Sequence, residues 1–277
     1  VYEKLGLDGS SSSRRQALMK LFEKKDLTAR VGLLDEIRGA LILLVMLYHA
    51  VMLFYQASPF PVLVPAWLES SWLQALVYAG AGIFVLISGA CCHFSRNNFR
   101  RGMILFLIAC VITGVTVVFH NGDFQVLWGI LHLLGFSMIL YDFLSRPLSK
   151  CKAVWAVPVL CVLFVLTFRL QDRALGIPYL WKFSLPMNHV QWLFPLGLTY
   201  PGFFSADYYP LMPWLFLFLI GTFWGRHLEE RRAPQWVYDT HCKPLAAIGR
   251  VTLWIYLIHI PLLYGIYYLT ALCMGLV

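Results

Sequence analysis

Seven apolar stretches, each long enough to cross a bilayer, constrain the fold of this chain more than any other feature. They cover residues 39–57, 72–93, 102–119, 126–144, 153–170, 209–226 and 250–273. A membrane-spanning helix needs about 20 mainly apolar residues, because the hydrocarbon core is roughly 30 Å thick. Only 13% of the 277 residues are charged, whereas a soluble domain carries about 25%. We therefore predict an all-α polytopic membrane protein, a bundle of about seven transmembrane helices.

The Lys and Arg residues indicate the orientation of these helices. The amino-terminal segment and three alternate connections (93–102, 145–152 and 226–250) hold 19 of the 22 Lys and Arg residues. Cytoplasmic connections carry the excess of positive charge in membrane proteins. We therefore expect a cytoplasmic amino terminus and a carboxyl terminus outside. This distribution explains the net charge of +8 without a nucleic-acid partner.

Residues 1–29 form a polar cytoplasmic segment ahead of the transmembrane domain, which we place at 30–277. Within it, Leu18, Leu21 and Phe22 recur at helical spacing among Arg and Lys residues. This pattern suits a short helix on the anionic inner leaflet. A solvated tail is an equally good interpretation.

The connection 171–208 is the longest one on the predicted outer side. Its apolar part is interrupted by Pro195, Gly197, Pro201 and Gly202, and a broken stretch of this kind tends to be re-entrant or to cap a cavity. It either presents an acceptor substrate on the outer side or forms a packed lid.

Three histidines lie inside predicted spans: His49 in the first, His132 in the fourth and His259 in the seventh. Counted from the nearest charged border at about 1.5 Å per residue, each sits roughly 13–16 Å into the membrane. One such histidine is usually a helix-to-helix hydrogen bond, but three at matching depth favour a polar cavity. Histidine suits general-base or acyl-acceptor chemistry because it titrates near neutrality. With no carboxylate at that level, we expect no metal.

Three further charged residues lie at the predicted membrane borders. Asp35 and Arg38 are one helical turn apart at the cytoplasmic mouth, where they either form a local ion pair or line an entrance for a phosphate-bearing cosubstrate, with Asp35 orienting Arg38. Asp207 stands before the sixth span. It either caps that helix or orients an amine or hydroxyl acceptor.

Several other functional classes lack their motifs here. The seven cysteines include no C-x-x-C pair, which argues against structural zinc. The sequence has no Gly-rich phosphate loop, no G-x-S-x-G elbow and no H-E-x-x-H. Seven spans are also typical of rhodopsins, but the seventh stretch contains no lysine to hold retinal.

The first predicted span carries a family resemblance. Arg30, Asp35, Arg38 and Gly39, followed by His49, resemble the first-span signature of the transmembrane acyltransferase superfamily. Three more segments resemble the heparan-α-glucosaminide N-acetyltransferase catalytic-domain family in its compact bacterial form. They are Trp128–Gly135, Ser205–Trp214 and Ile248–His259. The resemblance covers about residues 30–277.

This resemblance implies a multi-pass enzyme, in the bacterial plasma membrane, that moves an acetyl or other acyl group. The donor would be cytoplasmic acetyl-CoA, and the acceptor a sugar amine or hydroxyl on the outer side. The implied partners are acyl-CoA, a saccharide and the lipid bilayer. A homodimer is left open, and the acceptor and acyl chain length are not specified.

The resemblance also implies roles for individual residues. Arg38, with Asp35, would lie at the coenzyme side, and His49 would be the base or a transient acyl acceptor. Asp207 would join the catalytic set. The residues lining the substrate site would be His132, His259, Tyr208 and Trp214. The animal enzyme has its catalytic histidine in the loop after the first span, whereas loop 57–71 here has none, so His49 is a substitute for it.

Two other hypotheses compete with acyl transfer. A proton-coupled transporter would use the intramembrane histidines as a relay, and it predicts internal repeats with broken helices at matching positions. The chain has one broken region and no clear repeat. A structural membrane subunit would use the histidines for packing only.

Overall fold

The computed structural model describes residues 31–57, 67–68, 70–119, 125–177, 180–186 and 190–273. The helix predicted within 1–29 lies outside these residues. The chain divides into two compact units. One unit comprises the residues up to Leu68 together with those from Leu228 onward, and the other comprises Glu69–His227.

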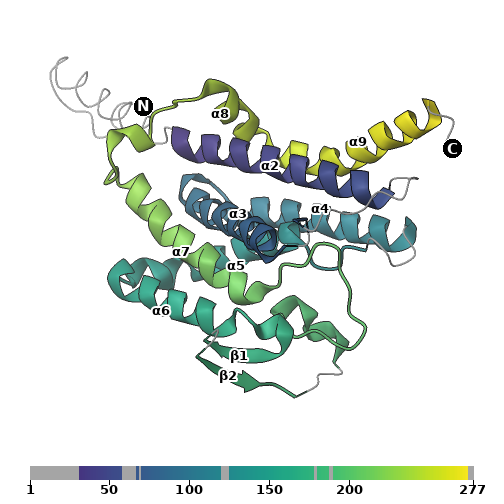
Figure 1. Cartoon of the computed structure of the whole chain (residues 1–277). Helices are drawn as coiled ribbons and strands as arrows, with labels where there is room; N and C mark the ends of the chain where they lie inside the picture. The colour runs from purple at the N-terminus through teal and green to yellow at the C-terminus, as the bar shows by residue number, and fades with distance from the viewer. Residues whose placement is uncertain are drawn as a thin grey trace, which may run out of the picture. The chain divides into compact units, whose positions relative to one another are not determined.

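Every apolar stretch identified in the sequence forms an α-helix (Figure 1). These helices are α2 (Gly32–Ala57), α3 (Ser71–Ala90), α4 (Asn98–Phe119), α5 (Ile130–Lys150), α6 (Ala153–Thr167), α7 (Leu211–Glu229) and α9 (Thr252–Cys273). Within the described residues, five segments are long and apolar enough to cross a membrane: Gly32–Tyr55, Ser71–Phe94, Asn98–Val118, Ala153–Asp172 and Thr252–Cys273. The protein is therefore an all-α polytopic membrane protein, as predicted.

The unit formed by the described residues up to Leu68 and from Leu228 onward is built around α2. The short helix α8 (Lys243–Arg250) and the longer α9 both pack against α2 (Figure 1). Two glycines bring α2 and α8 into backbone contact. A Cβ atom at Gly39 would collide with the Leu245 carbonyl, and one at Gly249 would collide with the Asp35 carbonyl. Small residues at a helix interface allow this close approach.

The other unit holds α3 to α7 and uses the same packing device. Gly102 on α4 and Gly135 on α5 each approach the backbone of the other helix. A Cβ at Gly221 of α7 would likewise collide with the Leu86 carbonyl of α3. Phe218 and Leu133 are fully buried in this unit. Many exposed side chains on α3, α4 and α6 are large and apolar, as expected of surfaces that face lipid.

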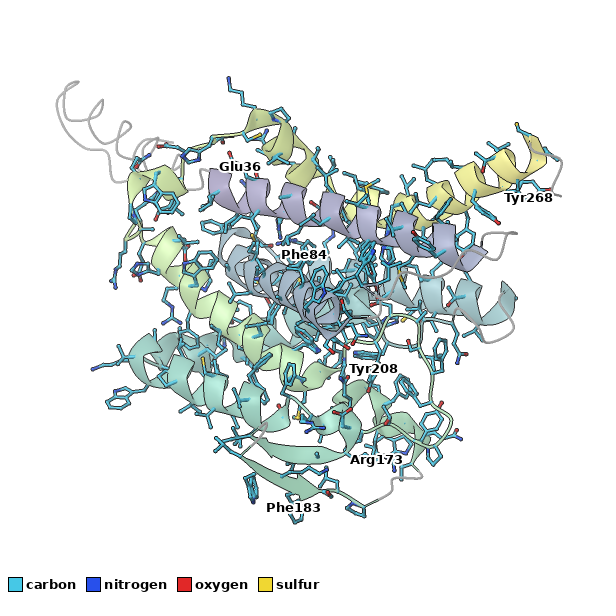
Figure 2. The ribbon with its side chains drawn as sticks, viewed as in Figure 1. Glu36, Phe84, Arg173, Phe183, Tyr208 and Tyr268 are labelled. Atoms are coloured by element: carbon cyan, nitrogen blue, oxygen red, sulfur yellow. The ribbon has the colours of Figure 1, made fainter. Side chains whose placement is uncertain are left out.

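The long connection after α6 contains the sheet of the described structure. Strand β1 (Ala174–Ile177) pairs antiparallel with β2 (Trp181–Ser184). The register places Leu175 opposite Phe183 and Ile177 opposite Trp181, which puts apolar side chains on one face. Phe183 projects away from the hairpin (Figure 2). Two short 3-10 helices, Leu170–Asp172 and Gln191–Leu196, flank the hairpin.

Candidate active site

A pair of histidines joins α2 to α9 in the first unit. The Nε2 atom of His259 lies 3.1 Å from Nδ1 of His49, and the ring centroids are 5.0 Å apart. His259 is 2% exposed, whereas His49 is half-buried. The Nδ1–H of His259 donates to the Tyr256 carbonyl at 2.6 Å. The structure therefore brings together two of the three histidines predicted to lie in the membrane.

The acidic residue at the start of α2 has a different partner from the one that spacing suggests. Asp35 Oδ2 accepts a hydrogen bond from Arg250 Nε of α8 at 3.5 Å. The Asp35 side chain is 14% exposed and that of Arg250 is 48% exposed. The ion pair thus fastens the amino-terminal end of α2 to the carboxyl-terminal end of α8. It also places Arg250, which we did not single out from the sequence, beside the predicted coenzyme entrance.

Arg38 lies on the same helix, one turn after Asp35. Its Nε atom is buried and has no hydrogen-bond partner among the described residues. A buried donor without an acceptor is costly, and guanidinium groups match phosphate oxygens well. The Arg38 environment thus fits an anionic group of a cosubstrate.

Glu36 is a second residue whose role the sequence did not disclose. Its Oε1 accepts hydrogen bonds from the backbone N–H of His241 and, at 2.7 Å, from that of Cys242. Its side chain is 10% exposed. Cys242 is the residue that precedes α8, so Glu36 (labelled in Figure 2) anchors the beginning of this helix. Only the tertiary pairing of α2 with α8 makes this contact, so no local pattern could have revealed it.

His132 lies in the second unit, where both of its ring nitrogens have partners. Nδ1 accepts from the Gly129 N–H at 3.2 Å, and Nε2 lies 3.4 Å from Thr113 Oγ1. The ring stacks on Trp128 with a centroid distance of 5.3 Å. His132 is 4% exposed. These contacts cap the first turn of α5 and tie it to α4, and a role in lining a substrate site stays a prediction.

Two of the segments that resemble the acetyltransferase family, Trp128–Gly135 and Ser205–Trp214, begin side by side in this unit. The segment before α7 bonds to the segment before α5 through Ala206 N to Gln125 O at 2.9 Å and Tyr209 N to Trp128 O at 3.0 Å. Leu127 N–H also donates to Ser205 Oγ at 3.1 Å. The motif that begins at Trp128 and the one that begins at Ser205 are therefore one structural element, although about 80 residues separate them.

Asp207 caps the amino terminus of α5, a helix that lies far from it in the sequence. Its Oδ2 accepts a hydrogen bond from the Ile130 N–H at 3.0 Å, in the first turn of α5. A Cβ at Gly129 would collide with this same carboxylate oxygen, so the glycine makes the approach of Asp207 possible. The carboxylate is half-buried. A negative group at a helix amino terminus is favourable.

Tyr208 and Trp214 also take part in packing within this unit. The Tyr208 hydroxyl donates to the Phe194 carbonyl at 2.7 Å, and burial raises the pKa of this phenol, which keeps it a neutral donor. Tyr208 lies in the connection that precedes α7 (Figure 2). Trp214 is 4% exposed and packs against Tyr78, Phe164 and Tyr209.

The β-hairpin borders a cavity of about 280 Å³. Its lining includes Arg169, Trp181 and Lys182. Arg169 is paired with Asp172 at 3.3 Å. Trp181 and Lys182 lie in the connection 171–208, which we predicted to face the outer side, and Arg169 lies just before it.

Comparison with known families decides the class of this protein. The family described as "Heparan-alpha-glucosaminide N-acetyltransferase, catalytic" matches residues 30–261. The chain belongs to this family. It is accordingly an acetyltransferase of the membrane, and the match confirms the resemblance seen in the sequence. No curated protein and no solved structure matches the chain. Within the described residues, no group of three or more His, Cys, Asp or Glu side chains is placed to hold a metal ion.

Proposed function

We propose that this protein transfers an acetyl group from cytoplasmic acetyl-CoA to an amine or hydroxyl of a saccharide on the outer side of the membrane. The bacterial plasma membrane is the proposed location. The observation that carries the proposal is the His49–His259 pair, which spans two helices of a chain that belongs to an acetyltransferase family. Part of the half-buried His49 is accessible, whereas His259 is 2% exposed, so His49 is the member of the pair that a substrate can contact.

The donor site lies at the start of α2 in this proposal. The buried, unpartnered Nε of Arg38 supports binding of a coenzyme A phosphate. The half-exposed Arg250 side chain, held by Asp35, adds a second guanidinium to the same unit. From Arg38 to His49 is eleven residues along α2, which is roughly 16 Å. An extended pantetheine arm covers such a distance, so the thioester can reach His49.

The reaction needs one base, and His49 supplies it. The acceptor nitrogen attacks the thioester carbonyl carbon, a C–N bond forms, and the C–S bond breaks. The proton leaves the nitrogen for a ring nitrogen of His49 and passes from there to the coenzyme A sulfur. The products are an acetamide and the coenzyme A thiol, and His49 returns to its neutral form. A hydroxyl acceptor follows the same sequence and gives an ester.

Reconstituted protein tests this assignment directly. With labelled acetyl-CoA and a panel of amino sugars, His49→Ala should lower the transfer rate by about 100-fold or more, the usual contribution of a general base. His227→Ala is the matched control, because His227 is exposed in the last turn of α7. Unchanged transfer by His49→Ala would refute the role of His49. Proton flux through liposomes without coenzyme A would favour the transporter hypothesis instead.

A further inference from the structure

We infer that His259 is a positioning residue that fixes the tautomer of His49, so that the lone pair of His49 stands on Nε2. The inference rests on the proposed function, because it assigns the atom of His49 that takes the proton. It follows from two contacts within one unit: the Tyr256 carbonyl with His259, and His259 with His49.

The contact with the Tyr256 carbonyl determines which ring nitrogen of His259 carries the proton. A carbonyl oxygen only accepts hydrogen bonds, so the 2.6 Å contact with Tyr256 requires a proton on Nδ1 of His259. A neutral imidazole carries a single N–H. The Nε2 atom of His259 therefore holds a lone pair and acts as an acceptor. At 2% exposure, the ring has little access to water that would compete for either nitrogen.

The contact between His259 and His49 then determines which ring nitrogen of His49 carries the proton. Because Nε2 of His259 accepts, Nδ1 of His49 at 3.1 Å must donate, and it carries the proton. A neutral His49 has only this one N–H. Its Nε2 then has the free lone pair that a base needs.

The arrangement follows the logic of a catalytic triad with a carbonyl in place of the carboxylate. The Tyr256 carbonyl orients the His259 ring, and the His259 ring holds His49, the base, in one tautomer. When His49 takes a proton on Nε2, its Nδ1–H still points at the lone pair of His259, which stabilises the cation. A neutral relay also avoids burying a carboxylate at membrane depth, which is expensive.

His132 provides an internal control with the opposite tautomer. The Gly129 backbone N–H donates to its Nδ1, so the proton of a neutral His132 stands on Nε2. The Thr113 hydroxyl donates to the Val126 carbonyl at 2.6 Å, which leaves its oxygen free to accept from His132 Nε2–H. One protein thus contains two buried or half-buried histidines whose contacts specify different tautomers.

Nitrogen NMR of the protein in lipid bilayers tests the inference without any substrate. With 15N-labelled histidine, and assignments from His49→Asn and His132→Asn, we expect His49 protonated on Nδ1 and His132 protonated on Nε2. In His259→Leu the His49 preference should disappear. In His259→Gln it should persist, because the side-chain carbonyl can accept from His49. A native His49 protonated on Nε2, or a tautomer unchanged in His259→Leu, would overturn the inference.

Kinetics separates this inference from the proposed function. His259→Leu should lower kcat by about 100-fold while KM for acetyl-CoA stays within about twofold, and His259→Gln should recover most of the loss. If His49→Ala is inactive but His259→Leu is as active as His259→Gln, the positioning role fails and the proposed function stands. If His49→Ala is fully active, the proposed function itself fails. Should His259→Leu not fold, the native NMR spectrum and His259→Gln still decide.

Discussion

At the scale of single residues, two glycines explain why charged groups meet at the start of α2. Gly39 and Gly249 directly adjoin Arg38 and Arg250 in the sequence, and each removes a Cβ that would collide with a backbone carbonyl. The close approach of α2 and α8 that results lets Asp35 reach Arg250. The pairs Arg38-Gly39 and Gly249-Arg250 thus lie at one interface, between α2 and α8.

This interface predicts a selective effect of adding one methyl group. Gly249→Ala should lower the free energy of unfolding in detergent by about 1–3 kcal/mol, since overpacking against backbone cannot be relieved by a rotamer change. Gly265→Ala is the matched control on α9, because a Cβ there meets nothing within 4 Å. Thermal unfolding of the two variants measures the difference. Equal stability of both would show that α2 and α8 do not pack as described.

The same residues show what spacing alone cannot decide. Asp35 and Arg38 stand one turn apart, so a local ion pair was a reasonable prediction, yet Asp35 bonds to a residue 215 positions later. A helix neighbour at this spacing contributes only a few tenths of a kcal/mol, so a partner held by backbone packing displaces it easily. His49 and His259 were predicted by their depth, and the structure brings them within hydrogen-bonding distance.

At the scale of elements, α5 depends on a residue from a distant connection for its amino-terminal cap. Asp207 lies four residues before α7 in the sequence, and local spacing favoured a cap on that helix. The connection also runs beside residues 125–130, so the carboxylate accepts a hydrogen bond from Ile130 N–H of α5. A cap acts on whichever helix end the tertiary structure brings near, and sequence distance does not reveal this.

Two variants of Asp207 separate its structural role from a role in binding the acceptor. Asp207→Ala should cost about 1 kcal/mol of stability through the lost cap, whereas Asp207→Asn keeps an oxygen that accepts from Ile130 N–H and should unfold like the native protein. If the carboxylate also orients an acceptor amine, Asp207→Asn should raise KM for the acceptor with stability unchanged. Native kinetics in Asp207→Asn would limit Asp207 to capping.

At the scale of the whole molecule, the sequence predicted the membrane class and the seven helices but not every detail of the connections. Apolar stretches determine where helices form, because the bilayer requires internally satisfied backbone hydrogen bonds. The hairpin of β1 and β2 was missed because its strands are only four residues long. The short helix α8 was missed as well, since it lies among charged residues and depends on its contacts with α2.

The predicted orientation is testable with one native cysteine, Cys151, and one introduced cysteine at position 184. Cys151 is exposed in a connection predicted to be cytoplasmic, and Ser184 is exposed in the hairpin predicted to be outside. In a Cys273→Ser background, a membrane-impermeant maleimide added to intact bacterial cells should label Ser184→Cys but not Cys151. Permeabilised cells should show labelling of both, because nothing but the membrane shields Cys151. Labelling of Cys151 in intact cells would reverse the orientation, and it would place the start of α2, with Arg38, on the side of the membrane that lacks coenzyme A.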